Sequence, residues 1–274
     1  MNWLGSLGPA LILELLALGI TAGFLAGLLG IGGGMLMVPF LTFIVSARGV
    51  EPALAVKMAV ATSMATILFT SLSSLRAHHR HGAVRWDLVR GLAPGIVLGG
   101  LAGGGGIFAL IKGQGLAVLF AAFVGFSAVQ MLLDRKPSPS RQMPGWAGQA
   151  AAGGGIGLMS GLVGAGGAFV SVPFMVWCNV PLRNAVGTSA ALGFPIAMAS
   201  TLGYLIAGWS LPPSVPGAFG YLYLPALVII SVASVMLAPL GARTAHRIDV
   251  KSLRKLFALL LLALAATMLY RVFG

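Results

Sequence analysis

The sequence predicts an all-α polytopic membrane protein with two inverted-topology repeats. Each repeat is expected to be a glycine-tipped broken or re-entrant helical hairpin followed by three transmembrane helices. Three observations predict this fold: an apolar composition, a glycine-rich phrase that occurs twice, and basic residues that alternate between loops. The chain has 274 residues, of which 58% are hydrophobic and 8% are charged. A soluble domain carries about 25% charged residues, so this chain cannot cover a surface that faces water.

Apolar stretches recur along the whole chain and predict membrane-spanning helices. A helix needs about 20 residues to cross the hydrocarbon layer, and only helices and closed barrels satisfy the backbone there. A barrel would show alternating segments of about 10 residues, whereas these stretches are continuous. The first stretch is expected to remain as a membrane segment, because no basic residues precede it as in a signal peptide. We expect helices near residues 10–29, 35–46, 54–75, 88–111, 115–133, 147–163, 168–178, 184–207, 220–241 and 253–272.

A duplicated pattern divides the chain into two halves. A glycine-rich phrase begins at Gly23 and returns 134 positions later at Gly157, and each copy ends in Val-Pro-Phe. A second block, residues 57–63, returns in the same order as residues 183–189. Two matched blocks in one order indicate an internal repeat rather than chance similarity.

The polar, proline-rich segment between the halves predicts a linker. We expect membrane repeat 1 over residues 1–133, a cytoplasmic linker over residues 134–146 and membrane repeat 2 over residues 147–274. All three belong to one integral membrane domain. Residues 35–46 form an arm too short to cross the bilayer, so we expect a half-helix there.

Basic residues occupy different loops in the two halves. The loop after the first matched helix is expected to hold Arg76, His78, His79, Arg80, His81, Arg85 and Arg90, whereas its counterpart, residues 208–221, has no charge. The following loop reverses this bias, with Lys112 in the first half and Arg243, Arg247, Lys251, Arg254 and Lys255 in the second. Lysine and arginine accumulate on the cytoplasmic side. Corresponding loops therefore face opposite sides, with the linker inside and both termini outside.

Consecutive glycines at the hairpin tips predict a site for an anion. Glycine costs about 1 kcal/mol relative to alanine inside a helix, but it accepts turn conformations. The helix that follows such a turn presents free N–H groups and a partial positive charge. The predicted substrate-binding glycines are Gly30, Gly32, Gly33 and Gly34 in the first tip, and Gly164, Gly166 and Gly167 in the second. The alternative is close helix packing, which we expect for Gly23, Gly27, Gly157 and Gly161, and for Gly91, Gly95, Gly99 and Gly103.

Polar side chains at matched positions extend this hypothesis. The pairs Thr62-Ser63 and Thr188-Ser189 either bind the anion or bond a carbonyl of their own helix. Lys57 and Arg183 either attract anions at opposite mouths or extend to the membrane interface. Glu14 is a candidate for proton coupling, unless it lies in the headgroup zone.

Other functions find little support in the residues. The net charge of +12 lies in short loops rather than in a patch for nucleic acid. Neither a nucleophile elbow nor a zinc-binding His-Glu-x-x-His pattern occurs, so we expect no enzyme, no metal and no cofactor. The single Cys178 is expected to be a small buried apolar residue. The His78–His81 cluster is expected to be solvated.

The doubled phrase resembles the TauE/SafE family of membrane permeases, also called the toluene-sulfonate uptake permease family. The resemblance rests on Gly27-Leu-x-Gly30-x-Gly32-Gly33-Gly34, on the following Val38-Pro39, on the second copy and on the two Thr-Ser helices. The second copy departs from the pattern at Ala168, where the first has Gly34.

The resemblance implies a transporter of anions with sulfur or carboxylate groups, in the cytoplasmic (inner) membrane of a bacterium or archaeon. Sulfite or an organosulfonate is the expected substrate, moved by alternating access around a site at the bilayer midplane. An anion channel and a carboxylate transporter of the same fold are the alternatives. A proton or sodium ion is the candidate coupling ion, and a homodimer is left open.

This topology predicts that Ser140 and Ser214 lie on opposite sides of the membrane. Single cysteines at these positions, in a Cys178→Ala background, are expected to react differently with an impermeant maleimide. The cysteine at position 214 should be labelled in intact cells, and that at position 140 only after the membrane is opened. Labelling of both from the same side would contradict the inverted arrangement.

Overall fold

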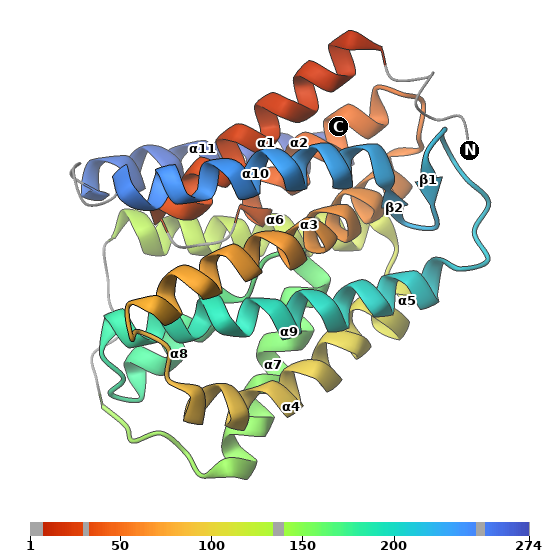
Figure 1. Ribbon diagram of the computed structural model, residues 1–274. Helices are drawn as coiled ribbons and strands as arrows, with labels where there is room; N and C mark the ends of the chain where they lie inside the picture. Colours follow the sequence, from red (N-terminus) through yellow and green to blue (C-terminus); the bar gives the residue numbers. More distant parts are fainter. Residues whose placement is uncertain (1–7, 30–32, 134–139, 245–249, 274) are drawn as a thin grey trace.

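Long helices fill the part of the chain that the computed structural model describes, residues 8–29, 33–133, 140–244 and 250–273. Figure 1 shows them as a bundle in which most helices run between the same two ends of the molecule. Six of the described helices are long and apolar enough to cross a membrane. Large apolar side chains cover the outside of this bundle, among them Leu98, Ile206 and Met236, which are 71%, 72% and 67% exposed. Such a surface fits a lipid environment, as the composition predicts.

The first half contains a long helix, a short helix and then three longer segments. Their bounds are α1 Pro9–Leu29, α2 Gly34–Ser46, α3 Pro52–Arg80, α4 Trp86–Ala102 and α6 Gly113–Leu132. A π-helical turn, η2 (Gly103–Ile107), and the short α5 (Phe108–Leu110) continue α4 without a break.

The second half repeats this order of long and short helices. Its helices are α7 Trp146–Val163, α8 Ala168–Trp177, α9 Leu182–Gly208, α10 Leu224–Thr244 and α11 Val250–Phe273. With 13 residues in α2 and 10 in α8, both second arms are shorter than the roughly 20 residues that a span requires. The predicted short arm of the first hairpin is thus confirmed, and the second hairpin has an arm of the same kind.

A small β-hairpin precedes α10, which the sequence did not lead us to expect. Strands β1 (Ala218–Phe219) and β2 (Leu222–Tyr223) pair antiparallel, with Ala218 opposite Tyr223. Gly217 and Gly220 have φ values of +87° and +55°, which glycine adopts without strain. These glycines allow the chain to turn tightly before it enters α10.

The basic residues after the first matched helix do not all lie in a loop, contrary to the expectation. Helix α3 continues to Arg80, so that Arg76 and His78 are helical, and Arg90 lies within α4. Basic side chains in the last turn of a helix interact favourably with its macrodipole. The turn ends at Gly82, whose φ is +63°. We call the end of the molecule formed by the C-terminus of α3, the N-terminus of α9 and residues 140–145 the basic end.

Glycines allow two pairs of helices to approach closely across the two halves. Helix α4 packs against α7, and α1 packs against α10. A β-carbon at Gly157 of α7 would clash with the carbonyl oxygen of Ile96 on α4, and one at Gly23 of α1 would clash with the backbone at Ser234 on α10. Gly95 and Gly99 of α4 and Gly103 at the start of η2 likewise leave no room for a β-carbon against the backbone of α7, and a β-carbon at Gly91 would meet the side chain of Gln149. The predicted packing role of these glycines is confirmed.

The contact of α4 with α7 predicts a cost for a single methyl group. In Gly95→Ala, the new β-carbon meets the carbonyl oxygen of Ala150, and such overpacking costs about 1–3 kcal/mol. The midpoint of thermal unfolding in detergent should fall accordingly. Gly125→Ala in α6 is the matched control, since nothing lies within 4 Å of its β-carbon and alanine favours a helix by up to about 1 kcal/mol. Equal effects of the two substitutions would contradict the close packing.

Candidate functional site

Two glycine tips join the long and short helices of the hairpins in the interior of the bundle. Gly33 precedes the first residue of α2, while Gly30 and Gly32 lie outside the described residues. In the second tip, Gly164 ends α7 and Gly167 precedes α8, with φ values of +72° and +76°. Only glycine adopts such conformations routinely. Gly164 and Gly167 are therefore required by the turn itself.

The two tips contact each other beside Ser63 of α3. The fully buried hydroxyl of Ser63 donates to the carbonyl oxygens of Gly34 and Gly164, at 3.4 and 3.3 Å. A β-carbon at Gly34 would clash with the same carbonyl oxygen of Gly164. The backbone of one tip thus rests directly on the other, and one serine hydrogen is shared between them.

The two matched threonines link each half to the other. The hydroxyl oxygen of Thr62 accepts the N–H of Tyr223, just before α10, and that of Thr188 accepts the N–H of Arg85, just before α4. Both distances are 3.0 Å. N–H groups at the start of a helix have no partner within it, so each threonine supplies one. Their part in binding an anion stays a prediction.

A cavity leads from the basic end to the second tip. It has a volume of about 130 Å³, roughly ten times the minimum for one water molecule, and is large enough for a small oxyanion. Gly166, Ala168 and Ser189 lie at its inner part. The remaining described lining residues are Ala26, Gly27, Ile67, Thr70, Ser71, Ser73, Ser74, Ala77, His78, Ala190, Gly193, Ala238 and Pro239. Within this described lining there is no lysine, arginine, aspartate or glutamate.

One wall of the cavity is a row of hydroxyl groups that the sequence analysis missed. Thr70, Ser71, Ser73 and Ser74 of α3 line it on the side toward the basic end. The spacing of Ser63, Ile67, Thr70, Ser71 and Ser74 by three or four residues places them on one helix face. That periodicity is the signal that could have found them. His78 continues this wall and is half-buried, so it does not belong to the fully solvated cluster that we expected.

The matched cations lie at opposite ends of the structure, away from this cavity. Lys57 donates to the carbonyl of Ala109 at 3.1 Å, and its ammonium lies 5.5 Å from the ring centroids of Phe108 and Tyr221. This arrangement is a cation–π contact with two rings. Arg183 donates to the carbonyl of His81 at 2.7 Å. Lys57 thus holds the end of α5 and Arg183 the segment after α3, and their role in attracting anions stays a prediction.

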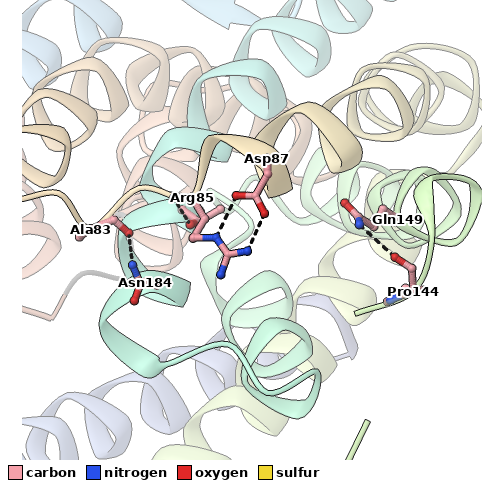
Figure 2. A network of polar contacts seen from close by, with 7 residues as sticks. Ala83, Arg85, Asp87, Pro144, Gln149 and Asn184 are labelled. Atoms are coloured by element: carbon pink, nitrogen blue, oxygen red, sulfur yellow. Dashed lines mark hydrogen bonds and ion pairs between the residues drawn. The ribbon is translucent and has the colours of Figure 1, made fainter. Parts of the chain in front are cut away.

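Further polar contacts hold the loop between α3 and α4 at the basic end. Asn184 of α9 donates to the carbonyl of Ala83 at 3.2 Å, and Arg85 forms an ion pair with Asp87 at 2.6 Å (Figure 2). The hydrogen bond to Asp87 raises the pKa of the Arg85 guanidinium. Gln149 bonds the carbonyl of Pro144 nearby, at the start of α7. These contacts hold the loops at the basic end, and none of the residues that form them lines the cavity.

Two other features lie outside this site. Glu14 is exposed on α1 and does not line the cavity, so its coupling role stays a prediction. A second cavity of about 550 Å³ lies between α2, α3, α6 and α11 at the opposite end of α3, where Glu51 and Gln114 border it. It does not reach the described residues of either tip.

Comparisons with known proteins place this chain in a family. A family profile described as "Sulfite exporter TauE/SafE" matches residues 15–268. A probable membrane transporter protein of Haemophilus influenzae is 35% identical over 258 residues, which cover 94% of this chain and 97% of that protein. A probable membrane transporter protein of Methanocaldococcus jannaschii is 26% identical over 244 residues, 88% of each chain. No solved structure matches the chain significantly.

The contact between the tips predicts unequal effects of two reciprocal substitutions. Gly34→Ala places a methyl group against the carbonyl oxygen of Gly164, which should cost about 1–3 kcal/mol through overpacking. Ala168→Gly, at the matched position, removes a methyl group beside the cavity and should cost less than about 1 kcal/mol. Thermal unfolding in detergent measures both. An equal loss in the two variants would argue against the tip contact.

Proposed function

The chain belongs to the sulfite exporter TauE/SafE family and is a multi-pass membrane transporter, and from this premise we propose that it is a secondary transporter of a small anion. Sulfite or an organosulfonate is the proposed substrate. The proposed location is the cytoplasmic membrane of a prokaryote, since the relatives come from bacteria and an archaeon.

The cavity is the observation that carries this proposal. Neutral polar groups line it: Ser189 on α9, the first residue of α8, Ala168, and hydroxyl groups along α3, of which Thr70 and Ser71 donate to the carbonyls of Ile67 and Leu68 in their own helix. A helix N-terminus carries a partial positive charge of about half a unit and free N–H groups. A sulfite or sulfonate group presents three oxygens that accept hydrogen bonds. Donors in the cavity can bond these oxygens in place of the water molecules of the hydration shell. An anion held this way needs no buried lysine or arginine.

We further propose that the halves are inverted repeats that exchange roles during transport. Support comes from contacts that occur twice between matched positions. Gly23 packs against Ser234 as Gly157 packs against Ile96. Thr62 caps the segment before α10 as Thr188 caps the segment before α4. Such paired contacts are expected when a pseudo-twofold axis relates two halves that rock around one site.

The substrate site is proposed at the inner part of the cavity, where Gly166 and Ser189 line it beside Gly164 and Gly167 of the second tip. In the conformation described, Gly34, Gly164 and Ser63 close the route beyond it, because the two tips are in contact there. The cavity therefore opens toward the basic end, which the distribution of cations places in the cytoplasm. In the opposite conformation, the cavity would be closed at the basic end, and the same anion would be exposed to the other side of the membrane.

The contact between the tips is the closure that an alternating carrier requires on one side of its site. A channel needs a continuous route in at least one conformation, whereas an alternating carrier keeps one side closed at all times. A carboxylate carrier of the same fold would use the same neutral donors for two oxygens instead of three. The coupling ion, a proton or sodium, and any dimer stay predictions.

A ligand screen tests the proposed substrate class. Sulfite and sulfoacetate should stabilise the purified protein, since a ligand at 100 times its Kd adds about 2.7 kcal/mol to the free energy of unfolding. The midpoint of thermal unfolding should rise by a few degrees. Sulfate, thiosulfate, taurine and simple carboxylates serve as comparison anions. A shift with carboxylates alone would make the organosulfur assignment wrong.

Flux into proteoliposomes separates the carrier from the channel. A carrier should show saturable uptake of the stabilising anion and exchange with anion preloaded inside. Flux that rises linearly with concentration and shows no exchange would contradict the carrier mechanism.

A further inference from the structure

We propose that Ser171 is a positioning residue that turns the hydroxyl of Ser189 toward the transported anion, so that the second half supplies a hydroxyl donor that the matched Ser63 of the first half does not. This inference rests on the proposed function. It adds a residue that is neither among the predicted site residues nor part of the cavity lining.

The two serines form a hydroxyl pair beside the second tip. Ser171 lies on α8 and Ser189 on α9, and their oxygens are 2.7 Å apart. Both side chains are buried, Ser171 completely. Ser189 also lines the cavity, whereas Ser171 is not part of the cavity lining. Ser189 thus has the cavity on one side and Ser171 behind it.

A count of hydrogens shows what this pair can offer. Two hydroxyl groups carry two hydrogens, and the bond between them uses one. When Ser171 donates to Ser189, the hydrogen of Ser189 is left free on the side of the cavity. A serine alone in a helix turns its hydroxyl to a carbonyl of the preceding turn. A donor at Ser171 opposes this rotation and leaves an O–H group directed at a bound oxyanion, where charge strengthens the hydrogen bond.

The described positions of the first half that match Ser171 and Ser189 do not form an equivalent pair. The position that matches Ser171 in the duplicated phrase is Met37, which is buried. Ser63, which matches Ser189, directs its single hydrogen to the tip carbonyls of Gly34 and Gly164. The first half therefore closes the contact between the tips, while the second half keeps a spare donor for the anion.

Binding of sulfite to purified variants tests this assignment by titration calorimetry. Ser171→Ala should weaken sulfite binding about tenfold, since one well-directed hydrogen bond to an anion is lost. Ser171→Thr retains a hydroxyl and should bind within about threefold of the wild type. Ser127→Ala is the matched control: Ser127 is also buried, but it bonds the carbonyl of Phe123 in its own helix at 2.8 Å. It should leave the affinity unchanged.

A double-mutant cycle distinguishes positioning from a general structural role. If Ser171 acts through Ser189, then Ser171→Ala should have no further effect on the affinity in a Ser189→Ala background. The unfolding midpoint without ligand shows whether either variant is merely less stable.

Three results would overturn the inference. Unchanged affinity in Ser171→Ala, or a full additional loss in the Ser189→Ala background, would exclude positioning while the proposed function stands. If the wild type binds neither sulfite nor any other anion of the screen, the proposed function and this inference are both wrong.

Discussion

The fold depends on one constraint, that backbone polar groups inside a bilayer must find partners within the protein. Both hairpins break their helices in the interior, at tips that cannot bond all their own carbonyls and N–H groups. The structure meets this need by bringing the tips together at Ser63, which bonds the carbonyls of Gly34 and Gly164. Thr62 and Thr188 do the same for the N–H groups before α10 and α4. The two halves are thus held together at the points where the backbone of one half has polar groups that need a partner from elsewhere.

Glycine serves this constraint in two different ways. At Gly164 and Gly167 a positive φ makes glycine necessary, because other residues rarely adopt that backbone conformation. At Gly95 and Gly157 the backbone is helical, and glycine is needed because a neighbouring helix leaves no space for a β-carbon. Without a strong hydrophobic drive between helices in lipid, such close approach supplies much of the packing energy. The same residue type therefore builds both the scaffold and the turn at the proposed site.

The sequence predicted the features that follow from local composition and repetition. These include the helices, the short arm after the first tip and the packing role of the α4 glycines. It did not predict the cavity, because Thr70, Ser71 and Ser74 lie within the expected helix 54–75 but become a wall only when the residues on one face of that helix are considered together. Ser171 was missed for a different reason. A comparison of two halves draws attention to residues that match, and Ser171 opposite Met37 is a position at which they differ.

Such differences carry particular weight in a duplicated carrier. Matched residues build a frame that can open to either side, but a single anion requires donors at one place only. Two equal sets of donors would offer two binding positions of equal free energy, one on each side of the tip contact. The anion would then have no preferred position. The spare hydroxyl hydrogen of Ser189 has no counterpart at Ser63, and Ala168 stands where the first half has Gly34. This difference would define a single preferred binding position. The substrate site is then expected where the repeat is least exact, and the matched residues around it are left free to move.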